Sequence, residues 1–116
     1  MPNEGRAEVL QGTLDLMVLQ TVGVLGPIHG YALASRLEQV SNGALQLNMG
    51  TLYPALMRLE QRGWLRAKWG FTDNNRRARF YSLTPAGRTA LESEKADWNR
   101  TAAIMHALLH QLPEQS

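Results

Sequence analysis

Apolar residues recur at the spacing of an α-helix in two segments near the start of the chain. In residues 13–25 the helical repeat consists of Leu14, Met17, Val18, Thr21, Val22 and Leu25. Thr13 can cap this helix, and Gly26 followed by Pro27 is a strong stop signal. A second helix that starts near Gly30 would bury Leu33, Leu37 and Val40.

A third helix is predicted to start around Met49 and to close before Gly63. Its inward face is formed by Leu52, Ala55, Leu56 and Leu59. Its outward face is formed by Thr51, Pro54, Arg58, Gln61 and Arg62. Pro54 must lie in or next to the first turn, because the missing N–H of proline costs little there.

The period changes from helical to alternating after the third helix, which is typical of β-strands. Residues 65–69 alternate apolar with basic side chains, and residues 78–83 form a second alternating run. The turn-rich segment 70–75 joins the two runs, so a hairpin is predicted. We expect Trp64 and Trp69, which flank the first strand, to lie in the core.

A long helix is predicted to close the chain. Thr84 followed by Pro85 is a typical helix start, and the helical pattern continues to about Gln111. At roughly 40 Å this helix is too long to fold back wholly onto a small core. The residues expected to pair with a second copy of the chain are Leu91, Trp98, Met105 and Leu112, spaced seven apart, together with Leu108.

Together these elements predict a fold that is mainly α with a small β-hairpin. Their order is that of a winged helix-turn-helix followed by a long C-terminal dimerisation helix. We expect an N-terminal arm over 1–12, the winged helix-turn-helix over 13–84 and the dimerisation helix over 85–116. In such a fold the third helix enters the major groove of DNA, and the hairpin reaches the adjacent backbone or minor groove.

The basic residues are concentrated in the two elements that would face DNA. Residues 58–88 hold eight basic and two acidic residues, whereas the rest of the chain holds four basic and eight acidic ones. The formal net charge of +2 therefore hides a basic block on the third helix and the hairpin. Such a block is typical of a surface that binds a polyanion, although a merely solvated face has the same composition.

Composition narrows the function classes. With no cysteine, the chain has no disulfide framework, thiol nucleophile or thiolate zinc site. No apolar stretch approaches the ~20 residues that span a bilayer, and no signal peptide is recognisable, so we expect a cytoplasmic protein. Without a catalytic spacing or a phosphate-binding loop, we expect neither an enzyme nor a cofactor. His106 and His110 have the spacing of two zinc ligands but lack a clear third, so no metal is expected.

Several motifs resemble those of the PadR family of bacterial transcriptional regulators. They are His29-Gly30-Tyr31, then Gly50-Thr51-Leu52-Tyr53-Pro54-Ala55-Leu56 with Leu59-Glu60 and Gly63, then Arg79-Phe80-Tyr81 with Leu83-Thr84 and Gly87. The length is similar to that of the subgroup with a single C-terminal helix. The resemblance implies a homodimeric repressor that a small molecule releases from DNA. It also implies that the last helix packs on the partner's N-terminal helix, which adds Leu14 and Met17 to the dimer contacts.

The predicted DNA contacts lie on the second helix, the third helix and the hairpin. They are Tyr31, Ser35, Asn48, Thr51, Tyr53, Pro54, Arg58, Asn75, Arg76 and Arg77. Thr51 is the candidate for reading a base edge, and Arg58 is expected to meet a phosphate, with guanine as the alternative. Arg76 and Arg77 suit a phosphate or a narrow minor groove. Two copies related by a twofold axis would read an inverted repeat.

Two alternatives stay open at this point. Trp98 on the seam of the last helix could enclose a planar aromatic effector together with its copy in the partner, or it could be a plain dimer-core residue. The protein as a whole could be a sequence-specific regulator bound to double-stranded DNA, or a winged-helix dimer that contacts proteins alone. The basic hairpin favours the regulator, and the salt dependence of DNA binding would separate the two hypotheses.

Overall fold

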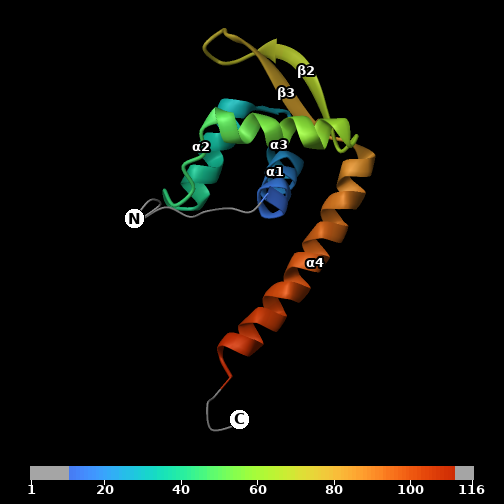
Figure 1. Cartoon of the computed structure of the whole chain (residues 1–116). Helices are drawn as coiled ribbons and strands as arrows, with labels where there is room; N and C mark the ends of the chain where they lie inside the picture. The colour runs from blue at the N-terminus through green and yellow to red at the C-terminus, as the bar shows by residue number, and fades with distance from the viewer. Residues whose placement is uncertain (1–10, 112–116) are drawn as a thin grey trace.

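The computed structural model describes residues 11–111 of the 116-residue chain. The helices are α1 (Gln11–Leu25), α2 (Gly30–Val40), α3 (Met49–Gln61) and α4 (Pro85–Leu109). The strands, in the antiparallel order β1-β3-β2, are β1 (Ile28–His29), β2 (Leu65–Phe71) and β3 (Arg77–Leu83). This is a mainly α winged helix-turn-helix with a small hairpin and a long C-terminal helix, as the sequence predicts (Figure 1).

The core lies where α1, α2 and α3 meet, and we call residues 11–91 around it the head. Its fully buried side chains are Val18, Leu19, Val22, Leu33, Leu52, Leu56 and Leu59. All of them except Leu19 belong to the predicted apolar stripes. Leu25 and Val40, predicted to complete two of these stripes, are exposed instead. Each is the last residue of its helix, where the stripe runs past the neighbouring elements.

The short strand β1 was not predicted from the sequence. Ile28 pairs with Tyr81 and His29 with Phe80, so the chain adds a third strand to the hairpin immediately before α2. His29 also caps α2, because its Nδ1 accepts a hydrogen bond from the N–H of Ala32 at 3.4 Å. Its ring meets Phe80 edge-on at 5.3 Å between centroids. These contacts fix the start of α2 against the sheet.

Two local details differ from the prediction. The helix α1 already begins at Gln11, so Thr13 lies inside the helix rather than at its cap, and the predicted arm over 1–12 ends in helix. Residues 1–10 lie outside the described part of the chain. Pro54 is the sixth residue of α3 and lies past the first turn, so the carbonyl of Gly50 lacks the usual N–H partner four residues on.

The helix α4 starts in tight contact with the head. Thr84 Oγ1 accepts a hydrogen bond from the N–H of Gly87 at 2.9 Å and donates one to the carbonyl of Gly63 at 2.6 Å. Gly87 is buried, and a Cβ at this position would lie 2.0 Å from the carbonyl oxygen of Trp64. The absence of a side chain at Gly87 therefore lets α4 begin directly against the backbone that leads into β2.

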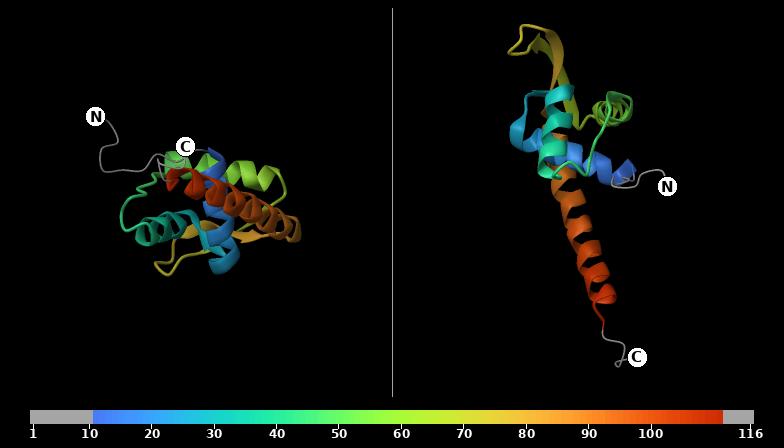
Figure 2. Two further views of the ribbon diagram at one scale, coloured as in Figure 1. Left: turned by 90° about the horizontal axis from the view of Figure 1, so that it is seen from below. Right: turned by 90° about the vertical axis from the view of Figure 1, so that its left-hand side faces the viewer.

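Two predicted dimer contacts are covered within one chain instead. Leu91 is 3% exposed, and Leu14 is also buried, because α1 and α4 pack on each other in the head. Met17 is partly buried against the same core. Beyond Leu91, α4 extends away from the head on the side opposite the hairpin (Figure 2). Leu112, the last predicted seam residue, lies outside the described residues.

Candidate nucleic-acid interface

The start of α3 presents polar side chains outward. Asn48 caps the helix, because its Oδ1 accepts a hydrogen bond from the N–H of Thr51 at 2.9 Å. Thr51, Tyr53 and Pro54 are exposed in the first two turns, whereas Leu52 between them is buried in the core. The start of α3, which was predicted to contact DNA, is therefore packed into the core on one face and exposed to solvent on the other.

Arg58, further along α3, is bound within the protein. Its Nη2 donates to Asp15 Oδ1 at 2.7 Å, and Arg62 Nη1 lies 3.7 Å from the other oxygen of the same carboxylate. Asp15 is buried on α1, so its charge requires these cations. Arg58 was predicted on the outward face as a DNA contact, but the buried carboxylate of Asp15 draws its guanidinium into the contact between α1 and α3. Arg58 therefore positions α3, and its charge is already paired within the protein.

One face of the hairpin combines aromatic rings with arginines. The strand register pairs Trp69 with Arg79 and Phe71 with Arg77, and residues opposite each other in antiparallel strands share a face. The guanidinium of Arg77 lies 4.5 Å from the centroid of the Trp69 ring. Trp69 is 57% exposed rather than part of the core, and the hairpin to which it belongs extends beyond the helices (Figure 1).

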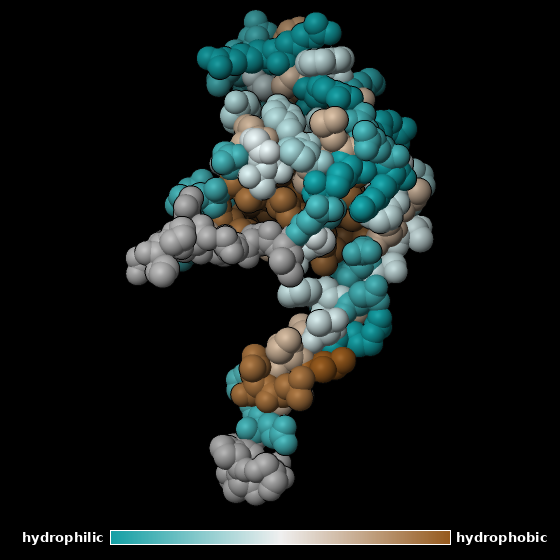
Figure 3. Space-filling view, viewed as in Figure 1, coloured by the Kyte–Doolittle hydropathy of each residue, from teal (hydrophilic) through white to brown (hydrophobic). Residues whose placement is uncertain are grey.

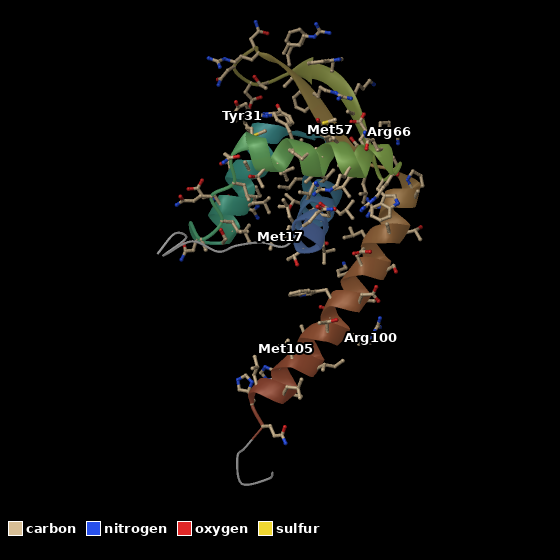
Figure 4. The ribbon with its side chains drawn as sticks, viewed as in Figure 1. Met17, Tyr31, Met57, Arg66, Arg100 and Met105 are labelled. Atoms are coloured by element: carbon tan, nitrogen blue, oxygen red, sulfur yellow. The ribbon has the colours of Figure 1, made fainter. Side chains whose placement is uncertain are left out.

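A cavity of about 680 Å³ lies between the hairpin and the two helices below it. Its lining includes Tyr31 of α2 and Tyr53 of α3 on one side, and Trp69, Arg76 and Arg77 of the hairpin on the other. Figure 4 shows Tyr31 on α2 beneath the overhanging hairpin. We call this space the wing cavity.

The wing cavity carries a positive charge. The guanidinium of Arg79 is neutralised by Glu60, with Nη2 and Oε2 2.8 Å apart. Arg76 and Arg77 have no carboxylate partner within residues 11–111, and Asp73 is the acidic residue in the lining. Two arginines against one aspartate leave a site that attracts anions.

Tyr81 lies at the buried side of the wing cavity. Its side chain is almost wholly covered, and the guanidinium of Arg79 is 5.9 Å from the centroid of its ring. Burial raises the pKa of Tyr81 above its ordinary value of 10.0, and the positive charge of Arg79 opposes this shift more weakly. The phenol is therefore neutral near pH 7 and adds an uncharged aromatic wall.

The structure brings part of the predicted DNA set to one place. Tyr31, Tyr53, Arg76 and Arg77 all line the wing cavity, although they come from three separate segments of the chain. Asn75 is exposed in the hairpin loop, where its φ of 61° fits an asparagine in a tight turn. Ser35, on α2 one turn beyond Tyr31, is exposed outside the cavity lining.

Sequence reasoning missed the roles of Asp15 and Trp69. Asp15 interrupts the apolar repeat of residues 13–25 on its buried face, and an acid on such a face needs a cation nearby. That signal was present in the sequence. Trp69 alternates with Leu65 and Ala67 as a core residue would, but alternation does not reveal how far a strand continues beyond the core.

A second exposed surface lies along α4. Trp98 is 49% exposed and borders a shallow hollow of about 300 Å³ with Thr13 and Leu16 of α1. The large exposed apolar residues of this helix, which we call the α4 stripe, are Trp98, Ile104, Met105, Leu108 and Leu109. Figure 3 shows apolar surface gathered at the far end of α4 and mostly hydrophilic surface over the hairpin.

His106 in the last turn of α4 and His110 at its C-cap do not build a metal site within the described residues. Their rings are tilted by 31° with centroids 4.1 Å apart, and residues 11–111 contain no group of three metal-ligating side chains. None of the described helices combines the length and the apolar character that crossing a membrane requires.

Comparison with known proteins places the chain among regulators. The sequence profile of the transcriptional regulator PadR-like family matches residues 18–93. An uncharacterised 37.1 kDa protein in a transposon of Streptomyces fradiae is 45% identical over 69 residues, which are 60% of this chain and 18% of that protein. A transcriptional regulator of Mycobacterium tuberculosis is 38% identical over 68 residues, 59% of this chain and 60% of the relative. The chain thus matches less than two thirds of the length of either relative.

Solved structures share the fold. A PadR-like transcriptional regulator from Bacillus cereus superimposes with a TM-score of 0.78 at 22% identity, over 91% of this chain and all of the other. At that identity the likeness concerns the fold alone. The family match itself covers well over half of the chain and includes α2, α3, the hairpin and the start of α4.

Proposed function

The chain belongs to the PadR-like family of transcriptional regulators, and we propose that it is a homodimeric repressor that reads an inverted repeat in double-stranded DNA. Family membership makes it a DNA-binding regulator of transcription. The dimer, the repeat and repression are the finer parts of the proposal. Its main support is that Tyr53 near the start of α3 and the hairpin arginines Arg76 and Arg77, which have no carboxylate partner within residues 11–111, line one cavity.

We infer the placement on DNA from the geometry of a winged helix. With the start of α3 in the major groove and the hairpin at the adjacent minor groove, the strand between the two grooves passes between these elements. The wing cavity lies there, so Tyr31, Tyr53, Arg76 and Arg77 would meet its phosphates. Thr51, exposed in the first turn of α3, would reach a base edge. Asn48, Pro54 and Asn75 would lie close to the DNA backbone, and Ser35 would lie at the margin of the contact.

The α4 stripe supports the proposed dimer. Its five apolar side chains are exposed in one chain, and a second copy that presents the same stripe would cover them. Twofold symmetry then places two α3 helices toward one face of DNA, so the operator would be an inverted repeat with half-sites about one helical turn, roughly 10 bp, or a multiple apart. Bound across a promoter, such a dimer would block polymerase.

The test separates contacts with phosphates from contacts with bases. The variant Arg76→Ala/Arg77→Ala should weaken binding to all duplexes alike and should flatten the salt slope by about 0.9 for each lost phosphate contact. Thr51→Ala should instead change which sequence is preferred. Arg88→Ala/Arg100→Ala removes the same charge from α4 and is the matched control.

Two results of this experiment would contradict the proposal. If the hairpin variant binds duplex DNA as the control does at every salt concentration, the hairpin is not a DNA contact. If the parent itself shows no salt-dependent binding to any duplex, the protein-only alternative holds.

Release by a small molecule is proposed at the hollow beside Trp98, whose indole is half exposed between α1 and α4. A ligand bound there must favour one spacing of the two α3 helices over another, since equal affinity for both arrangements would shift nothing. Trp98→Leu, compared with the parent in fluorescence titrations at matched dimer concentration, tests this part. If Trp98→Leu abolishes the dimer itself, Trp98 is a dimer-core residue instead.

A further inference from the structure

The wing cavity has features that a passage for a DNA strand does not need. Phosphate contacts require donors and positive charge, which the hydroxyls of Tyr31 and Tyr53 and the arginines can supply. The rings of Trp69 of β2 and Tyr81 of β3 line this cavity as well, so aromatic rings from four elements surround it. Its volume of about 680 Å³ lies within the range of small-molecule sites, roughly 300 to 1,000 Å³. The wing cavity is more than twice the size of the hollow beside Trp98.

We propose that the wing cavity binds a planar aromatic anion and that this ligand competes directly with DNA. The competition rests on the proposed function, whereas the binding site itself does not. Faces of the tyrosine and tryptophan rings offer stacking surfaces for a flat ring system. The guanidinium groups of Arg76 and Arg77 offer the charge for a carboxylate, sulfonate or phosphate on that ring system.

The charge balance selects an anion over a neutral or cationic ring. Glu60 already satisfies Arg79, which leaves Arg76 and Arg77 without a carboxylate partner within residues 11–111. Arg77 is also held over the Trp69 ring at 4.5 Å, so the cation and the stacking surface are already adjacent. Such a preformed pair lowers the ordering cost of binding.

Direct competition has a quantitative signature. Because the ligand would occupy the side chains that meet the DNA backbone, both cannot bind to one head together. The apparent Kd for DNA then rises with ligand concentration without reaching a plateau. An effector beside Trp98 would instead act through a coupling between separate sites, so its effect would level off, typically at about 5- to 150-fold.

The experiment uses a matched pair of dyes with the full-length protein. Anilinonaphthalene sulfonate carries a flat naphthalene ring system and one negative charge, and it fluoresces when it leaves water. N-phenylnaphthylamine has the same rings without the charge. Without DNA, we expect the sulfonate to bind the parent at least ~10-fold more tightly than the neutral dye, because one charge pair at a partly desolvated site contributes that much. A neutral dye that binds equally well would overturn the choice of an anion.

Three variants locate the dye. Trp69→Leu removes an exposed ring, and Arg76→Ala/Arg77→Ala removes the charge; each should weaken binding of the sulfonate about tenfold or more. Val40→Ala, which shortens an exposed apolar side chain of α2 outside the cavity lining, should leave binding unchanged. Unchanged affinity in Trp69→Leu, or equal weakening in Val40→Ala, would refute the wing site.

Competition is then measured against an operator duplex. At a dye concentration of ten times its own Kd, the apparent Kd for DNA should rise on the order of tenfold if one head must be free, and about a hundredfold if both must be. Further dye should raise it further, whereas a plateau would refute direct competition. The DNA affinity of the parent without dye tests the proposed function separately, since the dye site of the free protein does not depend on it.

Discussion

The hairpin and the far end of α4 both expose large apolar side chains, but their surroundings differ. Trp69 and Phe71 on the hairpin share their face with Arg77 and Arg79. On α4, the segment from Ile104 to Leu109 exposes four large apolar side chains and contains one ionisable residue, His106. The two surfaces lie at opposite ends of the molecule (Figure 2).

This difference indicates which partner suits each end. Aromatic rings beside guanidinium groups fit anionic or aromatic partners, because they combine stacking with charge. Aliphatic side chains without charges gain free energy when another apolar surface excludes water from them. Exposure of apolar area therefore does not by itself identify a partner; the charges beside it do.

The largest expected effect comes from placing charge on the α4 stripe. In Met105→Asp/Leu108→Asp, two carboxylates would be buried in the proposed dimer contact, so we expect monomers in sedimentation equilibrium. Affinity for an inverted repeat should fall at least ~100-fold, because the two heads no longer bind as one unit. Ala96→Asp/Ala103→Asp adds the same charge on the opposite face of α4 and should remain dimeric. If Met105→Asp/Leu108→Asp remains dimeric, the α4 stripe is not the dimer contact.

A smaller but still large effect is expected where the two regions join. In Gly87→Ala the new methyl group would lie 2.0 Å from the carbonyl oxygen of Trp64, and neither backbone can move without disturbing the cap at Thr84. We expect a loss of about 3 kcal/mol in the free energy of unfolding, measured in urea. Gly12→Ala, with open space at its Cβ, is the control and should change stability by less than ~1 kcal/mol. If Gly87→Ala and Gly12→Ala are equally stable, the close packing of α4 against the backbone of Trp64 does not limit the side chain at position 87.

The head and α4 also differ in how much the sequence reveals. The stripes of α2 and α3, the turn at Gly63 and the cap at Thr84 are local patterns that were predicted correctly, except that Val40 is exposed. In α1 the prediction omitted the buried Leu19 and included the exposed Leu25. The strand β1 was missed because two residues carry no period, and its existence depends on pairing with β3.

Tertiary contacts account for the other errors. Leu91 has the heptad spacing of a seam residue, but the spacing cannot tell that α1 covers it. Trp69 has the alternation of a core residue, but it lies where the hairpin leaves the helices. The wing cavity could not be predicted for the same reason, because its walls come from three separated segments.

Two ion pairs between an aspartate and an arginine, one in the head and one on α4, allow a further comparison of the two regions. Asp15 is buried in the head beside Arg58, whereas Asp97 is exposed on α4 beside Arg100. Asp15→Asn should lower the free energy of unfolding by about 2 kcal/mol, less than a fully buried pair would lose, because both arginines of its cluster stay partly in water. Asp97→Asn should stay within ~0.5 kcal/mol of the parent. If urea denaturation gives similar losses of unfolding free energy for Asp15→Asn and Asp97→Asn, burial of the Asp15 ion pair does not contribute to stability.

The smallest expected effect is an alkaline loss of stability that is specific to the head. Since burial raises the pKa of Tyr81 in the folded protein above 10.0, the unfolded chain loses this proton first. The contribution of Tyr81 to stability is thus fully present below pH 10 and is lost as the pH rises from 10 through the folded pKa, by at most about 1.4 kcal/mol per pH unit. No side chain of the α4 stripe titrates there, so the dimer dissociation constant should change less than the free energy of unfolding. Urea denaturation at pH 8 and pH 11, at fixed protein concentration, should show a smaller loss in Tyr81→Phe than in the parent; equal losses would show that Tyr81 is not the group responsible.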